Sequence, residues 1–354
     1  MQRHDDSLHD SAESGLRRRR PPLDPELGAV LASFPAEALA SVSANNISSL
    51  RRVLSTQTAD LRQIEQLDLI VDEYHAQAPD GAQVPLTVLR PRYSAGPVPC
   101  IYYIHGGGMI AGNRLLRVDK LAELVLELGV AVVSVEYRLA PEHPYPAGLH
   151  DCYAGLEWIS SHACENGFDP DYLLVHGVSA GGGLAAGIAL MARDFGGPQI
   201  THLILQAPML DDRNQTPSSS ELEGDAPWDR VSNVTGWSAL LGDGAGGPDT
   251  SPYAAPSRAE NLDHMPSTYI DVGQVETFRD EAIEFATRLA REGGLVEFHL
   301  WPGAWHGFDY TAPHAAVSQV SNQTRSAFID RAVASSLNVR QRPRTAGPAS
   351  DKRF

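Results

Sequence analysis

The alternation of apolar and polar positions along this chain predicts its elements most clearly from residue 98 onward. Short apolar runs rich in β-forming residues there alternate with longer stretches whose apolar positions recur with helical spacing. The runs predict strands at 99–104, 130–136, 172–176, 202–206, 267–272 and 296–301. The stretches between them predict helices at 117–128, 147–164, 180–194, 279–293 and 314–335. Such alternation is typical of a parallel sheet with helices on both faces, so the predicted class is α/β.

The part of the chain before residue 98 follows a different pattern. Residues 64–76 and 83–92 alternate like the paired strands of an antiparallel hairpin, with Pro79-Asp80-Gly81 as the turn between them. Further upstream, apolar positions with helical spacing predict one helix that begins at Asp24 or Pro25, and a second helical pattern runs from 35 to 54. We expect these two helices to form a cap over the α/β core.

Residues 207–266 interrupt the alternation of strands and helices. The segment is rich in Asp, Ser, Pro and Gly and contains Trp228 and Trp237. We interpret it as an insertion at the carboxyl edge of the sheet that contributes to the cap and to the wall of a binding site. These two tryptophans and Trp305 could line that site, but packing in the core explains each of them equally well.

The charge of the chain excludes some classes of partner. The formal net charge is −16, which argues against binding to nucleic acid or to an anionic membrane. No apolar run is long enough to span a bilayer. Residues 1–20 lack the apolar segment of a secretory signal, and the run Arg17–Arg20 is interpreted as part of a disordered basic tail.

The cysteines indicate a reducing compartment. Cys100, Cys152 and Cys164 make an odd number and lie far apart, so they do not suggest a disulfide framework. None of them belongs to a Cys-X-X-Cys or Cys/His pattern, and we therefore expect no metal site. Together with the missing signal, this predicts a cytoplasmic protein.

Two glycine-rich motifs carry the candidate chemistry, and each follows a predicted strand. His105–Gly108 follows the run 100–104, and Gly177–Gly181 follows the run 172–176. The second motif places Ser179 on a sharp turn between a strand and a helix, where the flanking glycines leave room for a nucleophile. The first motif can turn backbone N–H groups toward an oxyanion. Together the two motifs indicate acyl transfer by a serine hydrolase.

A serine nucleophile requires a general base and an acid, which in this topology follow it in the order acid, then histidine. His306 is the candidate base, because it lies in a loop after a predicted strand; His299 lies within that strand, and His314 begins a helix. Glu276 is the candidate acid, because it lies in the loop after strand 267–272. Asp280 is the next choice, although carboxylates in a first helical turn are favoured without any catalytic role.

At these residues the chain resembles the hormone-sensitive-lipase-like branch of the α/β hydrolases, a family of esterases with an HGGG motif. The resemblance spans residues 24 to 335 and rests on His105–Gly108, Tyr137–Glu142, Gly177–Gly182 and His306–Phe308. Two positions depart from the family pattern. Val178 replaces the usual aspartate before the serine, and Glu276–Glu281 replaces the usual segment Asp-Pro-Leu-Arg-Asp-Glu.

The resemblance implies an α/β-hydrolase fold, with a mostly parallel central sheet, helices on both faces and a helical N-terminal cap. It implies that Gly107, Gly108 and Ala180 donate the oxyanion hydrogen bonds and that Arg138 and Glu142 are structural, paired at the edge of the core. It also implies a small-molecule ester substrate with a short to medium acyl chain, no cofactor, and a homodimer. The expected organisation is a disordered tail at 1–22, a helical cap at 23–60, a catalytic domain at 61–336 and a second disordered tail at 337–354.

Two other functions are compatible with these motifs. The same triad could act on an amide, a carbamate or a lactone, because preference for the leaving group depends on the pocket. A non-catalytic small-molecule-binding protein of the same fold is a second possibility. Binding proteins that resemble this family keep the fold but lack the catalytic histidine, whereas His306 is present here. A lipase for long-chain fat is disfavoured by the absence of a signal peptide and of a long apolar lid.

Overall fold

The computed structural model describes residues 20–224 and 226–340, and its centre is one sheet of eight strands in the order β1-β2-β4-β3-β5-β6-β7-β8. The strands are β1 (Leu69–Gln77), β2 (Gln83–Pro91), β3 (Val98–Ile104), β4 (Ala131–Val135), β5 (Phe168–Val178), β6 (His202–Gln206), β7 (Ser267–Gly273) and β8 (Val296–Trp301). The first two strands form an antiparallel hairpin, β2 pairs antiparallel with β4, and every other pair is parallel. The predicted strands and the predicted hairpin are therefore confirmed.

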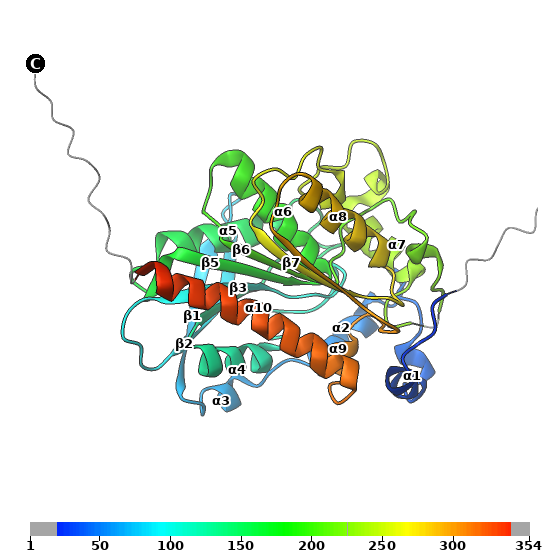
Figure 1. Cartoon of the computed structure of the whole chain (residues 1–354). Helices are drawn as coiled ribbons and strands as arrows, with labels where there is room; N and C mark the ends of the chain where they lie inside the picture. The colour runs from blue at the N-terminus through cyan, green and yellow to red at the C-terminus, as the bar shows by residue number, and fades with distance from the viewer. Residues whose placement is uncertain (1–19, 225, 341–354) are drawn as a thin grey trace, which may run out of the picture.

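Helices cover both faces of the sheet (Figure 1). The helices α5 (Ala147–Ser161), α6 (Ala180–Phe195) and α8 (Arg279–Arg291) pack on one face, and α4 (Val118–Leu128) and α10 (Ala316–Arg340) pack on the other. This arrangement confirms the predicted α/β class. The last helix continues beyond residue 337, where the tail was expected to begin.

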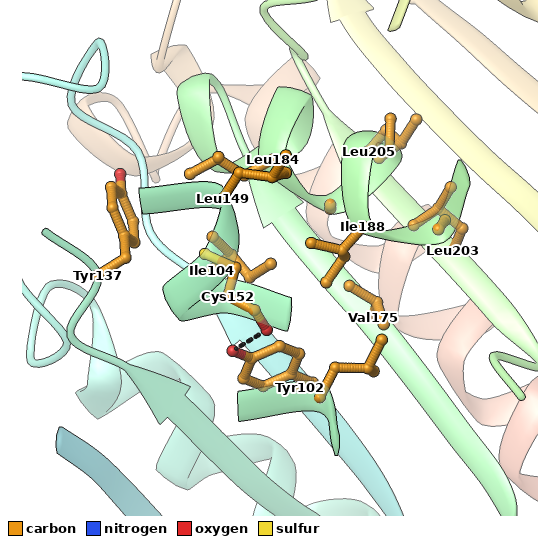
Figure 2. Packing of buried hydrophobic residues seen from close by; sticks show 14 of the residues in the cluster. Tyr102, Ile104, Tyr137, Leu149, Cys152, Val175, Leu184, Ile188, Leu203 and Leu205 are labelled. Atoms are coloured by element: carbon orange, nitrogen blue, oxygen red, sulfur yellow. Dashed lines mark hydrogen bonds between the residues drawn. The ribbon is translucent and has the colours of Figure 1, made fainter. Parts of the chain in front are cut away.

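The two faces of the sheet bury alternate residues of the same strands. Tyr102 of β3 points toward α5, where its hydroxyl donates a hydrogen bond to the carbonyl of Cys152 at 2.8 Å (Figure 2). Its neighbour Tyr103 belongs to the opposite cluster, with Phe328 and Ile329 of α10. Because both faces are buried, the strands read as continuous apolar runs, and each fully buried large side chain stabilises the fold by about 1.5–3 kcal/mol.

The helix predicted to begin at Asp24 or Pro25 is present in the structure as α1 (Pro25–Ala32). The Asp24 side chain caps the helix by accepting hydrogen bonds from the backbone of Glu26 at 2.9 Å and Leu27 at 3.1 Å. The indole of Trp305 donates a hydrogen bond to the carbonyl of Leu27 at 3.3 Å, which holds the helix against the loop after β8.

The single helix expected over 35–54 is wrong. The chain instead forms a short 3-10 helix η1 (Ala36–Ala38) and, after a turn, α2 (Ile47–Ser55), and a short helix α3 (Leu61–Ile64) follows. Asn46 stabilises the turn, because its side chain accepts from the backbone of Ser43 at 2.6 Å and donates to the carbonyl of Ser41 at 3.0 Å. Short polar side chains thus compete with helical hydrogen bonds.

The segment 207–266 contains η2 (Ser218–Ser220), α7 (Arg230–Leu241), η3 (Gly242–Gly244) and η4 (Pro256–Arg258). It holds the turn before α2, because the Ser232 hydroxyl accepts from the backbone of Val42 at 2.8 Å and Thr235 donates to the carbonyl of Val42 at 2.9 Å. The remaining helix is α9 (Phe308–Thr311).

The expected tails fall mostly on residues 1–19 and 341–354, which lie outside the described residues. Within the described ranges no helix is both long enough and apolar enough to cross a membrane. The same ranges hold no group of three or more His, Cys, Asp or Glu residues that could bind a metal ion.

Candidate active site

Ser179 lies on a strained turn between β5 and α6. Its backbone has φ 57° and ψ −119°, an unfavourable region for a residue with a side chain. Two hydrogen bonds stabilise the turn: the Ser179 N–H donates to the carbonyl of Gln206 at 2.8 Å, and its carbonyl accepts from the N–H of Met209 at 3.0 Å. The strain therefore fixes the direction of the serine side chain.

The glycines around Ser179 are required by close backbone contacts. A Cβ atom on Gly177 would lie 2.1 Å from the carbonyl oxygen of Gly181. A Cβ atom on Gly181 would lie 2.1 Å from the carbonyl oxygen of Ile104. No other residue fits at either position, which explains the motif in physical terms.

His306 and Glu276 lie in line with the serine. The Nε2 atom of His306 is 3.0 Å from the Oγ of Ser179, and its Nδ1 atom is 2.9 Å from Oε1 of Glu276. The second carboxylate oxygen of Glu276 accepts a hydrogen bond from the N–H of Gly273 at 3.0 Å. Since a carboxylate can only accept, Nδ1 carries the proton and Nε2 is free to accept the serine proton.

The other candidate acids and bases have different partners. Asp280 accepts hydrogen bonds from the backbone of Ser218 and from the Arg279 side chain, both at 2.7 Å. His299 contacts Glu297 at 3.0 Å, within its own strand. The structure thus brings together the first-choice residues Ser179, Glu276 and His306, and it leaves the alternatives apart.

The three expected oxyanion donors lie around the serine turn. Gly107 has φ 123° and Gly108 has φ 65°, and a Cβ atom on Gly107 would lie 2.1 Å from the carbonyl oxygen of Ala111. Within the described residues, the N–H groups of Gly107, Gly108 and Ala180 have no hydrogen-bond acceptor. Ala180 is also the first residue of α6, where the helix dipole favours negative charge.

His105 anchors the glycine loop through its ring. Its Nδ1 donates to the carbonyl of Gly106 at 2.8 Å, and its ring stacks on Tyr137 with centroids 4.2 Å apart. Burial lowers the pKa of His105 to about 4, so the ring is neutral at neutral pH. It is therefore a structural support for the loop.

A cavity of about 460 Å³ lies over these groups. Apolar side chains from the first 60 residues line one side of it, namely Phe34, Leu50, Val53 and Leu54. The insertion contributes Trp228. Of the other two tryptophans considered, Trp237 is buried in the core and Trp305 packs against α1, so neither lines the cavity.

Residues 101–310 match a protein family described by the α/β hydrolase fold. The chain belongs to this family, in its hormone-sensitive-lipase-like branch. Esterase LipI of Mycobacterium tuberculosis is 33% identical over 308 residues, which cover 86% of this chain and 93% of LipI.

Two solved structures share both fold and sequence with this α/β hydrolase. One is described as a bacterial heroin esterase, with 38% identity, a TM-score of 0.81 and coverage of 88% of this chain and 98% of that chain. Esterase LipW from Mycobacterium marinum has 34% identity and a TM-score of 0.77, with the same coverage of both chains.

In this α/β hydrolase, Arg138 and Glu142 do not pair with each other. Arg138 binds Asp151 with its Nη2 at 2.7 Å and also reaches Asp80 at 2.7 Å. Glu142 binds Arg51 through both oxygens, at 2.8 and 2.7 Å, and these hydrogen bonds lower the pKa of Glu142 to about 2. Because Arg51 belongs to α2, the ion pair between Arg51 and Glu142 connects α2 to the core.

One group near the serine was not predicted from the sequence. Arg325 of α10 donates to Asp271 at 2.9 Å and to Asp309 at 3.2 Å, and Gln206 donates to Asp309 at 2.7 Å. All four side chains line the catalytic cavity on its inner side. The four residues lie on four elements that are far apart in the sequence. They are of common polar types, so no motif in the sequence predicted that they would meet.

Proposed function

We propose that this α/β hydrolase is a serine carboxylesterase that hydrolyses esters with short to medium acyl chains through an acyl-enzyme intermediate. The observation that supports it best is the pair of contacts of His306, 3.0 Å to Ser179 and 2.9 Å to Glu276. The names of the relatives agree: LipI is called an esterase, and a 32% identical relative in M. tuberculosis, NlhH, a carboxylesterase.

In the first half-reaction, His306 takes the proton from Ser179 as the serine oxygen attacks the ester carbonyl carbon. Glu276 keeps the proton of His306 on Nδ1 and stabilises the imidazolium that forms. The imidazolium then gives its Nε2 proton to the leaving alcohol oxygen. In the second half-reaction, water activated by His306 releases the carboxylic acid and restores the serine.

The N–H groups of Gly107, Gly108 and Ala180 bind the oxyanion of each tetrahedral intermediate. Their lack of an acceptor within the described chain supports this role, because such donors stay available for the substrate. Losing one donor of this kind typically raises the barrier by about 3 kcal/mol. The apolar side of the cavity, with Leu50 and Val53, suits an acyl chain.

Hydrolysis of p-nitrophenyl esters from acetate to palmitate tests this proposal. We expect the wild type to prefer short and medium chains, and Ser179→Ala to lose nearly all turnover. Ser134→Ala is the control, since Ser134 is also buried but its hydroxyl donates only to the carbonyl of Arg114. A folded wild type that hydrolyses no ester and is not labelled at Ser179 by a fluorophosphonate contradicts the proposal; labelling without ester turnover points to another acyl bond.

We also propose a cytoplasmic homodimer that forms through β8. This strand lies at the edge of the sheet, and Leu295 just before it has 74% of its surface exposed. All three cysteines are unpaired, which suits a reducing compartment. Light scattering on the purified protein, compared between wild type and Leu295→Glu, tests the dimer, and cell fractionation tests the compartment.

A further inference from the structure

A second cavity of about 400 Å³ adjoins the catalytic one and is lined by residues of α4, α9 and α10. Figure 1 shows these three helices near one another on one side of the sheet. The two cavities share part of their walls: Tyr103, Arg117, Val178, Gln206, Asp309 and Arg325 line both. These residues therefore form the side of the catalytic cavity that faces α4 and α10, opposite in the fold to the cavity lining from α2.

Two arginines belong to this shared wall, and they differ in their partners. Arg325 is neutralised by Asp271 and Asp309. Arg117 is half-buried and makes no ion pair with any carboxylate of the described residues; its guanidinium instead lies over the ring of Tyr310, 4.2 Å from the centroid. In a chain with a net charge of −16, an arginine without an ion pair in the catalytic cavity is available to an anionic ligand.

The backbone holds Arg117 in place. Its φ is 64°, an uncommon left-handed conformation for a residue with a side chain, at the N-cap position directly before α4. Uncommon conformations of this kind persist where the surrounding structure holds them, and they are frequent at functional sites. Stacking on Tyr310 further restricts the guanidinium, so an anion would meet a preorganised donor.

The position of Arg117 indicates which part of the substrate it faces. Its Nη2 atom is 3.9 Å from the place that a Cβ atom on Gly307 would occupy, directly after His306. Because His306 delivers its proton to the leaving oxygen, the alcohol part of the ester lies on the His306 side of Ser179. Arg117 therefore flanks the alcohol rather than the acyl chain.

We propose that Arg117 binds a carboxylate on the alcohol part of the substrate, so that the enzyme prefers esters of acid-bearing alcohols such as hydroxybenzoates. This inference rests on the proposed esterase function and adds the substrate class. The second cavity on the other side of this wall is lined by further polar side chains, among them the buried His176.

Arg117 has one neighbour that argues for a merely structural role. Burial alone would raise the pKa of Asp309, yet Arg325 and then Arg117 lower it. A counter-charge for Asp309 would stabilise the fold without distinguishing substrates. The experiment must therefore compare an anionic substrate with a neutral one of the same shape.

The test uses 4-acetoxybenzoate and 4-acetoxybenzamide, which have the same acyl group and differ in the charge of the alcohol. We expect Arg117→Gln to lower the ratio of their kcat/KM values by about tenfold or more, mainly through KM for the anionic ester, because hydrogen bonds to charged groups are strong. Arg117→Lys keeps part of the preference. Arg92→Gln is the control, since Arg92 is paired with Asp68 and is not among the residues that line either cavity.

Ionic strength provides a second readout. Salt near 1 M shortens the screening length to about 3 Å, so it should weaken the preference of the wild type and leave Arg117→Gln unchanged. An equal loss for both esters in Arg117→Gln, or an unchanged ratio, overturns the proposal and leaves Arg117 as a counter-charge.

A binding measurement separates this proposal from the esterase function. Calorimetry on Ser179→Ala should show that 4-hydroxybenzoate binds at least about tenfold more tightly than 4-hydroxybenzamide, and that Arg117→Gln in this background removes the difference. If the wild type hydrolyses no ester but this binding is seen, the esterase function fails while the anion site stands. If Ser179→Ala does not discriminate between the two phenols, the anion site is wrong.

Discussion

Gly108 faces the indole of Trp228 so closely that a Cβ atom on the glycine would lie 2.2 Å from Cη2 of the ring. The tryptophan belongs to the 207–266 insertion, and its carbonyl accepts a hydrogen bond from Thr277 at 3.0 Å. The insertion therefore packs against the glycine loop at Gly108. A substitution in this contact tests how closely the loop geometry is coupled to turnover.

We expect Gly108→Ala to reduce kcat by about 10²–10³-fold, because the added methyl group displaces an N–H that we assign to the oxyanion. Gly129→Ala is a matched control: both glycines have φ 65°, but nothing lies within 4 Å of the Cβ position at Gly129. Both variants should lose stability through backbone strain, and only Gly108→Ala should lose turnover. Similar kcat values for the two variants would show that the close approach of Gly108 and Trp228 is not coupled to turnover.

The acid is tested by amide substitutions at two neighbouring carboxylates. Glu276→Gln should lower kcat by up to about 10⁴-fold, because a glutamine can donate to Nδ1 of His306 and so favours the wrong tautomer. Asp280→Asn should mainly reduce stability, since Asp280 binds Ser218 and Arg279 rather than the histidine. Steady-state kinetics on p-nitrophenyl acetate decides between them, and the reverse result assigns the acid to Asp280.

The connection between α2 and the core is tested at Arg51. This side chain donates to Glu142 and to the carbonyls of Ile110 at 2.8 Å and Ala140 at 3.1 Å. Because α2 lines the cavity, we expect Arg51→Met to raise KM several-fold for medium-chain esters with little change in kcat. Arg52→Met is the control on the same helix, as the Arg52 side chain donates its hydrogen bond to Ser49 of that helix and not to the core. An unchanged KM in Arg51→Met would show that this anchor of α2 does not affect substrate binding.

The sequence predicted the sheet well because a buried parallel strand must be apolar on both faces. A run such as Cys100–Ile104 is too apolar to form a surface segment. Gly181 cannot be replaced, because a Cβ atom there would lie 2.1 Å from the carbonyl oxygen of Ile104. Chain order then restricted the base to a late loop, and the structure places His306 there. These features depend on local chemistry or on the order of elements.

The features that could not be predicted depend on contacts between distant segments. The break before α2 arises where Asn46 bonds to Ser41 and Ser43, and helical spacing over the whole segment concealed it. Glu142 was expected to pair at the edge of the core, and its partner lies 91 positions upstream. Arg117 stands before an ordinary amphipathic helix, and only the fold brings it to the catalytic cavity.

Two buried histidines should make the protein less stable in acid. Burial lowers the pKa of His105 to about 4 and that of His176 to about 3, against about 6.5 in an unfolded chain. Between these values the unfolded state binds more protons, so stability is present at neutral pH and is lost as the pH falls below about 6.5. Each histidine then removes about 1.4 kcal/mol per pH unit.

Buried carboxyl groups change the pH dependence of stability in the opposite direction. The contribution of one histidine to the slope of unfolding free energy against pH must therefore be isolated by substitution. Burial raises the pKa of Glu281, whose stabilising effect is therefore lost as the pH rises. Urea unfolding of wild type and His176→Gln between pH 7 and pH 4.5 isolates one histidine, which faces Gln206, Asp309 and Arg325. The variant should have a pH dependence smaller by about 1.4 kcal/mol per unit, whatever its stability at pH 7. If the free energy of unfolding has the same pH dependence in both proteins, the prediction is wrong. That result would mean that His176 is already protonated in the folded state, because an exposed imidazole in the unfolded chain must titrate.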